Sequence, residues 1–526
     1  MKRRKKKNVK NSALTLIYSI DNFFKGLFFF IIIILLFYFN AKIKSTFMMN
    51  TEETLLITQV DHYDAIINDD EIKEGDITTS SELKHLTIST LPLVLAFLLQ
   101  YVFSITSVYS AGQLGAKELA ACSLAICTFN ITGLAIFQGM ATSLDTFCSQ
   151  AYGSGNKTMV GIYFQRGSLL MLMVMVPLTI LWWFSGSVLK FLVPDPELVS
   201  MTQFFLRIHI LGVPGLIFFE SGKRFLQAQH IFQASTYILM VTFPVNLVLN
   251  WWLVWNDETS IGYMGVPVAI AITYWIIALL MLLYVIFIDG MECWGGIEWE
   301  KACSNWKPML SLAIPGVVMV ISDFLAFEIL TIFASRFGTE ALAAQSIVSN
   351  IATLCFQVPF AFAVAISTRM GHLIGDENIS GAKVVNGLTV IIGGTIGVAS
   401  FMLMYFGRKV LASFFTNDEK VLTIASSLLF LAGINQISDA LNVVGTGVLR
   451  GQGRQRIGSI LNIISYYFLA IPLGYVLAFK LNMEMSGLWI GLIIGVMTLA
   501  IAQCTAICLS NWTKIVEHSH RIHDSV

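Results

Sequence analysis

Twelve apolar segments, each long enough to cross a lipid bilayer, follow one another along the sequence with short polar stretches between them. A spanning helix needs about 20 apolar residues because it rises about 1.5 Å per residue. The alternating pattern of a membrane β-barrel strand is absent, so the segments favour helices. We therefore predict an all-α polytopic membrane protein whose helices occupy approximately residues 86–110, 118–141, 162–184, 197–219, 231–254, 263–288, 308–335, 341–366, 383–407, 421–447, 457–479 and 485–509.

The composition agrees with a membrane protein and limits what else the chain can bind. Only 13% of the residues are charged and 56% are hydrophobic, whereas about 25% charged residues are usual in soluble domains. The formal net charge is +0, which argues against a nucleic-acid partner. The eight cysteines form no CxxC pair and lie at no zinc-like spacing from histidine. We expect no disulfide framework, no metal and no cofactor.

Residues 1–82 form an N-terminal extension with three parts. A basic head, MKRRKKK, precedes a short apolar segment at residues 23–39, and an acidic stretch follows, which we expect to be disordered. The apolar segment fits a signal-anchor that spans, a helix in the membrane interface or a cleaved leader. Farther along the chain, lysine and arginine are more frequent in the loops on the side of residue 85, eleven against seven. Both ends of the twelve-helix unit are therefore expected in the cytoplasm.

An internal repeat divides the spanning region into two halves. KHLTISTLP ends at Pro92 and KPMLSLAIP ends at Pro315, an offset of 315 − 92 = 223 residues, and LGAKELAA/FGTEALAA and FLQAQ/VLRGQ recur at the same offset. Six helices per half is an even number, so the repeats are parallel, as in carriers that work by alternating access around a central cavity. We predict an N-terminal bundle at 83–288, a cytoplasmic linker at 289–307, a C-terminal bundle at 308–510 and a cytoplasmic tail at 511–526.

A polar, glycine-rich stretch, GMATSLDTFCSQAYGSGN at residues 139–156, interrupts the apolar pattern. It resembles the signature loop of the multidrug and toxic compound extrusion (MATE) transporters, especially their eukaryotic branch. FEIL at 327–330 and VLRGQGRQRIGSILNIISYYFLAIPLGYVLAF at 448–479 extend the resemblance, which covers about residues 83–510. The resemblance implies a secondary antiporter that exports organic cations, drugs or other amphipathic metabolites in exchange for protons or sodium.

Four residues of this stretch are candidates for a structural role: Asp145, Thr146, Gln150 and Gly153. Glycines permit tight turns and close helix contact, and the polar side chains are expected to cap backbone groups where the helix unravels. On this interpretation the motif is a hinge between helices that substrate does not touch. Direct contact with substrate is the alternative, which we consider less favoured.

Three carboxylic acids lie deep in spanning segments of the second half: Asp323, Glu328 and Asp439. A charged group at mid-bilayer costs roughly 2.5–3.5 kcal/mol, so it usually has a function. The repeat places Gln100, Ile105 and Leu216 at the equivalent positions of the first half, and an acid present in only one half fits ion coupling. In a low dielectric a carboxyl group favours its neutral form and can exchange a proton for a cation.

The resemblance assigns the same three acids to proton or sodium coupling and cation recognition. The sequence departs from the eukaryotic pattern at Asp323, where Glu is usual, and at Phe324 and Leu325, where a Trp pair is common. These departures put the substrate range in doubt. An interhelical hydrogen bond is the structural alternative for each acid.

Other polar residues have less specific interpretations. Gln100 and Asn130 either line the cavity or join helices by hydrogen bonds. Lys223, Arg224 and the loop at 450–456 are interpreted as topology determinants, and the tail EHSHRIH as a solvated or structural segment.

Three classes of function remain open from the sequence. A carrier is favoured, either the antiporter described above or a flippase for lipid-linked precursors from the related superfamily. A non-transporting membrane receptor or scaffold would leave the intramembrane acids unexplained. An enzyme is not expected, because no Walker A loop, HExxH or GxSxG motif occurs. The expected partners are a small organic cation or amphipath, H⁺ or Na⁺ and the lipid bilayer, with the chain a monomer in the plasma membrane or a vacuolar or other endomembrane.

Overall fold

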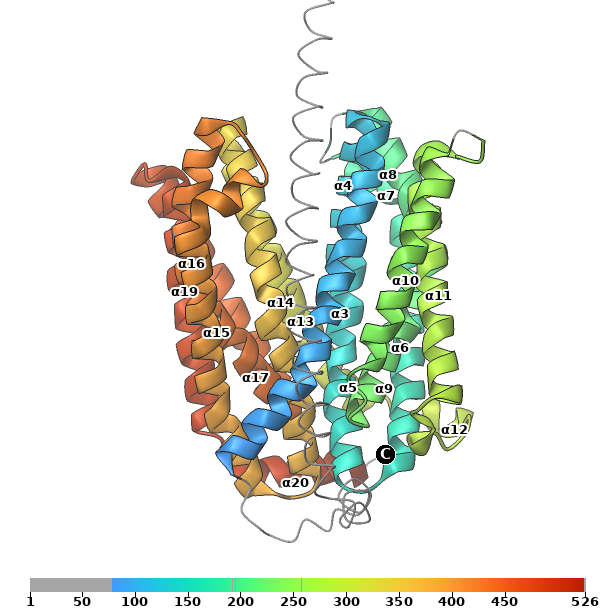
Figure 1. Cartoon of the computed structure of the whole chain (residues 1–526). Coiled ribbons are helices and arrows are strands. Elements are labelled where there is room, and N and C mark those ends of the chain that lie inside the picture. Colours follow the sequence, from blue (N-terminus) through green and yellow to red (C-terminus); the bar gives the residue numbers. More distant parts are fainter. Residues whose placement is uncertain (1–77, 192, 194, 257, 525–526) are drawn as a thin grey trace, which may run out of the picture.

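The structure, a computed structural model, describes residues 78–524 except 192, 194 and 257, and the described part of the chain is built from helices joined by short turns (Figure 1). Twelve of its helical segments are long and apolar enough to cross a membrane, which confirms the predicted all-α polytopic class. The predicted basic head, apolar segment and acidic stretch lie outside the described residues.

Six spanning segments form the first bundle. They comprise α3 (Thr79–Leu114); α4 (Ala116–Phe129), η1 (Asn130–Leu134) and α5 (Ala135–Gly153); α6 (Lys157–Trp183); α8 (Pro196–His209), η2 (Ile210–Gly212) and α9 (Val213–Ala228); α10 (Ala234–Asn250) and η3 (Trp251–Trp255); and η4 (Gly262–Met264) and α11 (Gly265–Phe287). The short α7 (Ser185–Leu189) lies between α6 and α8.

Six more spanning segments form the second bundle. They comprise α13 (Lys307–Ala334) and η6 (Ser335–Phe337); α14 (Thr339–Gly375); α15 (Ile379–Ser413); α16 (Glu419–Gly451); α17 (Gln455–Ile463), η7 (Ile464–Ala470), α18 (Ile471–Tyr475) and η8 (Val476–Lys480); and α19 (Glu484–Cys508). The ribbons of the two bundles diverge toward the end that carries α4 and converge toward the end that carries α20 (Trp512–Asp524) (Figure 1).

Local sequence signals set several helix starts. Asp195 caps α8 by accepting a hydrogen bond from the Glu197 amide, and a proline follows the cap. Asp418 caps α16 in the same way. In the turn after α5, Gly155 has a φ of 76°, a left-handed conformation that glycine adopts without steric cost.

Several helices extend beyond the predicted spans at the α20 end of the molecule. The span predicted at 118–141 continues to Gly153, and the span predicted at 341–366 continues to Gly375. The added turns are polar in sequence but buried, because the two bundles pack against each other there. The helix ends predicted from hydropathy alone therefore came too early in the sequence.

The segment between the bundles is docked on α6. It contains η5 (Met291–Cys293) and α12 (Trp299–Ala302). The Gln165 side chain donates to the Gly296 carbonyl at 2.8 Å, and the Arg166 guanidinium donates to the Lys301 carbonyl at 2.7 Å. These contacts tie the connecting segment to the first bundle.

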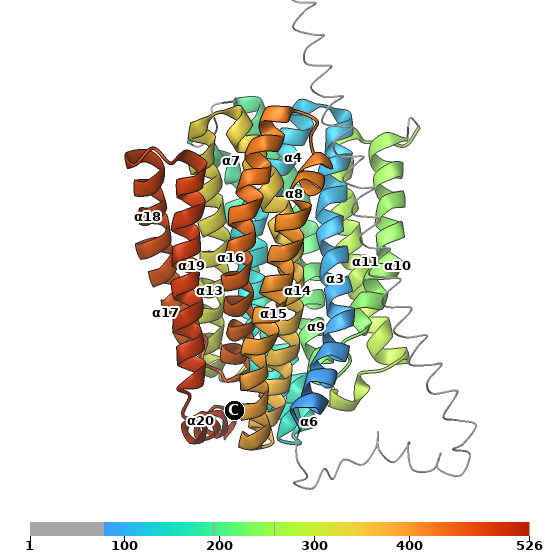
Figure 2. The same ribbon diagram turned by 60° about the vertical axis from the view of Figure 1, so that its left-hand side comes forward.

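The C-terminal tail forms the helix α20. Figures 1 and 2 place α20 at the end of the molecule opposite α4. Ile515 and Ser519 are buried against the bundles, and the Ser519 hydroxyl donates to Oε1 of Gln150 at 2.8 Å. The tail thus contacts the polar stretch of α5.

Candidate functional site

Asp323 on α13 and Asp439 on α16 lie close enough to interact electrostatically. Nδ2 of Asn462 donates to Oδ1 of Asp323 at 3.0 Å and also to the Met319 carbonyl at 3.3 Å. The Tyr466 hydroxyl provides a second hydrogen bond to Asp323. Asp439 is buried, whereas Asp323 is partly exposed. Two acids that the sequence singled out from separate helices therefore share one site.

Neutral donors from the second bundle surround this carboxylate pair. Asn442, three residues after Asp439 on the same helix, hydrogen-bonds to the Asp439 side chain. Asn462 is itself held by Gln503, whose Nε2 lies 3.4 Å from the Asn462 Oδ1. Fixed neutral donors orient a carboxylate without cancelling its charge. The site can consequently bind a proton or a cation at the two acids.

Glu328 lies apart from the carboxylate pair. It follows Asp323 by five residues, a rotation of about 140° around a helix. The Cys127 thiol of α4 lies 3.4 Å from Oε1 of Glu328 and donates to it. Glu328 therefore faces the first bundle, whereas Asp323 interacts electrostatically with Asp439 of the second.

Gln100 and Asn130 are both partly exposed in the first bundle. Gln100 lies on α3 next to Tyr101, whose hydroxyl donates to Oδ1 of Asn350 across the bundles at 2.7 Å. Asn130 begins the π-helical segment η1. A π-helical turn is frequent at functional sites, because it locally changes which side chains face inward.

The polar residues of the signature stretch join the two bundles. We expected them to cap their own helix, but α5 continues through them to Gly153. The Thr146 hydroxyl instead donates to the Arg450 carbonyl at 2.6 Å, and Nε2 of Gln150 donates to the Gly451 carbonyl at 2.9 Å. Those carbonyls belong to the last turn of α16, where helix carbonyls lack partners within the helix. The motif caps the opposite bundle.

A pseudo-symmetric contact lies between α14 and α9. Nε2 of His372 is 2.8 Å from the Ala228 carbonyl, the last residue of α9. Gly451 and Ala228 are 451 − 228 = 223 residues apart, and His372 and Gln150 are 372 − 150 = 222 apart. The acceptors of the two contacts thus show the repeat offset, and the donors differ from it by one residue.

Small residues let the helices of the junction approach closely. A Cβ added to Gly153 would overlap the His372 backbone of α14, and one added to Gly139 would overlap Val317 of α13. Close backbone contact of this kind is typical of helix packing in membranes.

A buried cluster of charges lies beside the motif. Oδ1 of Asp145 is 2.8 Å from Nε of Arg224, and Nζ of Lys223 is 2.8 Å from Oε1 of Glu220. Arg450 interacts with Asp145 as well. Lys223, Arg224 and Arg450 are therefore not loop residues that only set topology, because all three are buried in helices.

Glu220 was not identified from the sequence. It lies three and four residues before Lys223 and Arg224 on α9, the spacing at which opposite charges pair on one helix face. That spacing is the sequence signal by which Glu220 could have been identified.

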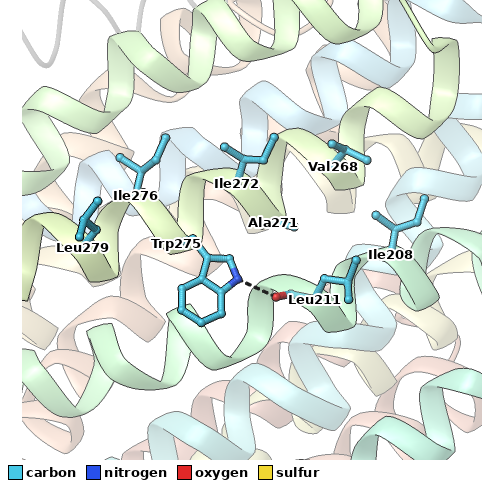
Figure 3. Close-up of a pocket in the computed structure, with 8 residues that line it drawn as sticks. All are labelled: Ile208, Leu211, Val268, Ala271, Ile272, Trp275, Ile276 and Leu279. Atoms are coloured by element: carbon cyan, nitrogen blue, oxygen red, sulfur yellow. Dashed lines mark hydrogen bonds between the residues drawn. The ribbon is translucent and has the colours of Figure 1, made fainter.

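An apolar groove of about 480 Å³ is open to the surface of the first bundle (Figure 3). It is formed by side chains around η2 and along α11, and Trp275 donates to the Leu211 carbonyl at 2.8 Å within it. Leu211, Trp275 and Leu279 are exposed, as expected for a surface that faces lipid. A lining without charged groups makes the groove unsuited to cation coupling.

A model of the MatE family matches the chain twice, at residues 92–252 and 315–476. The chain belongs to the MatE family. The two matches begin 315 − 92 = 223 residues apart, the offset of the repeat, and one match lies in each half of the chain. The resemblance found in the signature stretch is confirmed, and MatE membership makes the chain a membrane transporter.

Two further proteins are similar over most of the chain. The yeast "Uncharacterized transporter YDR338C" of Saccharomyces cerevisiae is 38% identical over 86% of this chain, which spans 65% of the relative's length. "Multidrug and toxin extrusion protein 2" of Mus musculus is 31% identical over 81% of this chain and 74% of its own length.

Solved MATE structures have the same fold. The crystal structure of the eukaryotic MATE transporter AtDTX14 superposes with a TM-score of 0.79 at 25% identity, covering 84% of this chain and 99% of that one. The Vibrio cholerae MATE transporter VcmN in the bent form gives a TM-score of 0.71 at 18% identity, covering 84% and 99%. Together with the family match, these similarities confirm the twelve-helix fold of two bundles.

Proposed function

We propose that this MATE protein is a secondary antiporter that exports organic cations in exchange for protons by alternating access. The observation that carries the proposal is the pairing of Asp323 with Asp439. Their closest hydrogen-bond donors are neutral, so the two ionised acids repel each other. One proton or one bound cation relieves that repulsion, and the two therefore compete for the site.

The three acids have different roles in this mechanism. Asp323 is the leading coupling residue, because it is partly exposed and can exchange with the solvent of the cavity. Asp439 is its buried partner. Glu328, which faces α4, is suited to recognise a cation that lies between the bundles.

The proposed direction of transport follows from the arrangement of the bundles. Their junction lies at the α20 end, which we assign to the cytoplasm. This arrangement corresponds to the state that is closed to the cytoplasm. Protons then enter from the outer side and substrate leaves there. A single chain supplies both bundles, which supports a monomer as the working unit.

Transport in proteoliposomes tests the proposal. Labelled tetraethylammonium is a suitable probe because its positive charge does not change with pH. We expect vesicles that contain the reconstituted full chain to accumulate labelled tetraethylammonium when a proton gradient drives protons across the membrane in the opposite direction. Asp323→Asn keeps the size of the side chain but cannot release a proton, so gradient-driven accumulation should fall at least about tenfold at equal protein abundance.

A matched variant distinguishes loss of proton coupling from the general effect of removing a carboxylate from this bundle. Glu340 lies in the first turn of α14 in the same bundle and is exposed. Glu340→Gln should therefore transport like the wild type. Accumulation driven by a sodium gradient but not by a proton gradient would reject proton coupling. Wild-type pH dependence in Asp323→Asn would transfer the coupling role to Asp439 or Glu328.

A further inference from the structure

The C-terminal helix α20 is anchored at its start to the second bundle. Three residues, 509–511, join it to the end of α19. Nη1 of Arg454, in the turn before α17, donates to the Ser510 hydroxyl at 2.6 Å. Oδ1 of Asn511 accepts a hydrogen bond from the Lys514 amide at 3.2 Å and so caps the helix. Any movement of the second bundle therefore carries the start of α20 with it.

One face of α20 packs against the rest of the protein. It comprises the positions i, i+3, i+4 and i+7 of a helical stripe: Trp512, Ile515, Val516 and Ser519. All four are buried or partly buried, and Ile515 belongs to the same apolar cluster as Met370 and Leu373 of α14. The other face carries Glu517 and Arg521, which are exposed. Burial of the apolar stripe holds α20 in place.

Ser519 on the packed face reaches the first bundle. Its hydroxyl donates to Oε1 of Gln150 on α5 at 2.8 Å, and Nε2 of the same Gln150 donates to the Gly451 carbonyl of α16 at 2.9 Å. Both ends of the Gln150 amide are thus bound by the second bundle, one end by α16 and the other by α20. Gln150 is only 2% exposed, so a broken contact would leave a buried polar group without a partner unless water enters.

His520, the next residue, contacts the second bundle instead. Its Nε2 lies 3.0 Å from Oε1 of Glu377, in the turn between α14 and α15, and both side chains are exposed. Adjacent residues of α20 therefore bind different bundles. The helix lies at the end of the molecule where the two bundles converge (Figures 1 and 2). Its packed face consequently bridges the junction, where α5 meets α14 and α16.

We propose that α20 is a strap that fastens the junction through the contact between Ser519 and Gln150 and that releases α5 in each transport cycle. Opening toward the α20 end requires α5 to move away from α16. Because α20 moves with the second bundle, the hydrogen bond from Ser519 breaks in the same step. The strap therefore stabilises the state that is closed at this end. The inference rests on the proposed alternating access but does not depend on the coupling ion.

Hydrogen–deuterium exchange of the full chain in lipid nanodiscs tests whether the strap holds the junction closed. Ser519→Ala removes the hydroxyl and leaves Oε1 of Gln150 without its donor. Exchange of the backbone at residues 150–156 should rise at least about threefold, as expected for the loss of one buried hydrogen bond. Glu517→Gln changes the exposed face of the same helix and should exchange like the wild type. Unchanged exchange in Ser519→Ala, even with a lower melting temperature, would reduce α20 to a structural role and reject the strap.

Reversible cross-linking tests whether the strap has to release. Exposed Cys303 and Cys508 are first replaced by serine, and Ser519→Cys is combined with Gln150→Cys. A short bifunctional methanethiosulfonate then ties α20 to the first bundle. We expect accumulation of tetraethylammonium to fall at least about tenfold on cross-linking and to return when a reductant removes the reagent. Accumulation that continues in the cross-linked protein would show that the contact persists through the cycle, which contradicts the proposal.

A second cysteine pair controls for immobilisation of the helix. His520→Cys with Glu377→Cys ties α20 to the second bundle, to which it already belongs, so transport should continue after cross-linking. Loss of transport in both pairs alike would mean that α20 acts by its own mobility and not as a strap between the bundles.

Failure of the strap is distinguishable from failure of the proposed function. Transport by the wild type together with unchanged exchange in Ser519→Ala leaves antiport intact and rejects the strap. This comparison decides the point even where the substitution at Gln150 itself stops transport. Absence of gradient-driven accumulation in the wild type would instead reject the antiport on which the inference rests.

Discussion

Individual charges in the junction are stabilised by partners that come from other helices or from the next helical turn. Asp145 on α5 pairs with Arg224 on α9, and Lys223 pairs with Glu220 one turn earlier. All four side chains are buried. Removing one member of a buried pair leaves the other charge uncompensated, which is more costly than losing an exposed pair.

Asp145→Asn should therefore destabilise the whole protein. The variant leaves Arg224 buried without its partner, and the expected loss is about 3 kcal/mol of unfolding free energy. We expect a fall of several degrees in the melting temperature of the purified protein. Because the defect lies in the junction, transport should decline to the same extent for chemically different substrates.

Glu292→Gln is the matched control for that variant. Glu292 pairs with Lys157 at 2.5 Å, but both side chains are about half exposed, so the change should leave the melting temperature almost unaltered. Loss of one substrate with normal transport of another in Asp145→Asn would indicate direct substrate contact instead.

At the residue scale, the sequence singled out the acids within the spanning helices but not the partners of the charges at the junction. Asp323 and Asp439 were identifiable because an acid within an apolar segment is a local anomaly. The pairing of Asp145 with Arg224 was not, because the partners are contributed by α5 and α9 and only the packing of these helices brings them together. Lys223 was misread as a loop residue for the same reason.

At the scale of elements, the closest helix crossing depends on glycine. Gly153→Ala would place a methyl group against the His372 backbone, which no side-chain rotation can relieve. Overpacking of this kind costs about 1–3 kcal/mol, so the melting temperature should fall.

Gly394→Ala on α15 is the control variant for Gly153→Ala. The added methyl group meets no atom within 4 Å, and alanine favours a helix over glycine by about 0.5–1 kcal/mol. Its melting temperature should stay level or rise. Equal melting temperatures for the two alanine variants would contradict the close contact between α5 and α14.

The segment between the bundles provides a second prediction, because two cysteines lie in it. Cys293 is buried, and burial raises the pKa of its thiol to about 12, with the Glu292 carboxylate adding to the effect. Cys303 is exposed. Since the thiolate is the reactive form, a maleimide at pH 8 should label Cys303 and leave Cys293 unmodified.

Peptide mapping by mass spectrometry measures that labelling. Both cysteines should react once the protein is denatured, which controls for the reagent. Rapid labelling of Cys293 in the native protein would contradict the docking of this segment on α6. The sequence could not predict the docking, because Gln165 and Arg166 hold the segment through backbone carbonyls and not through a recognisable motif.

At the scale of the whole molecule, the structure changes the argument for orientation. Four of the eleven basic residues counted on the inner side are buried in helices: Arg166, Lys223, Arg224 and Arg450. The remaining count is 11 − 4 = 7, equal to the outer side. Lys84, Lys514 and Arg521 lie in exposed positions at the same end, which restores the excess. The end with α20 therefore remains the expected cytoplasmic face.

Native cysteines allow the parallel repeat and this orientation to be tested together. Cys303 lies before the second bundle, Cys508 is the last residue of its last spanning helix, and both are exposed. Six helices separate them, so parallel repeats place both on the same face. A membrane-impermeant maleimide should label both in inverted vesicles and neither in right-side-out vesicles. Asn417→Cys, in the exposed turn between α15 and α16 at the other end, should show the reverse pattern. Labelling of Cys303 and Cys508 from opposite faces would reject the parallel repeat, and labelling of both only from outside would keep the repeat and invert the orientation.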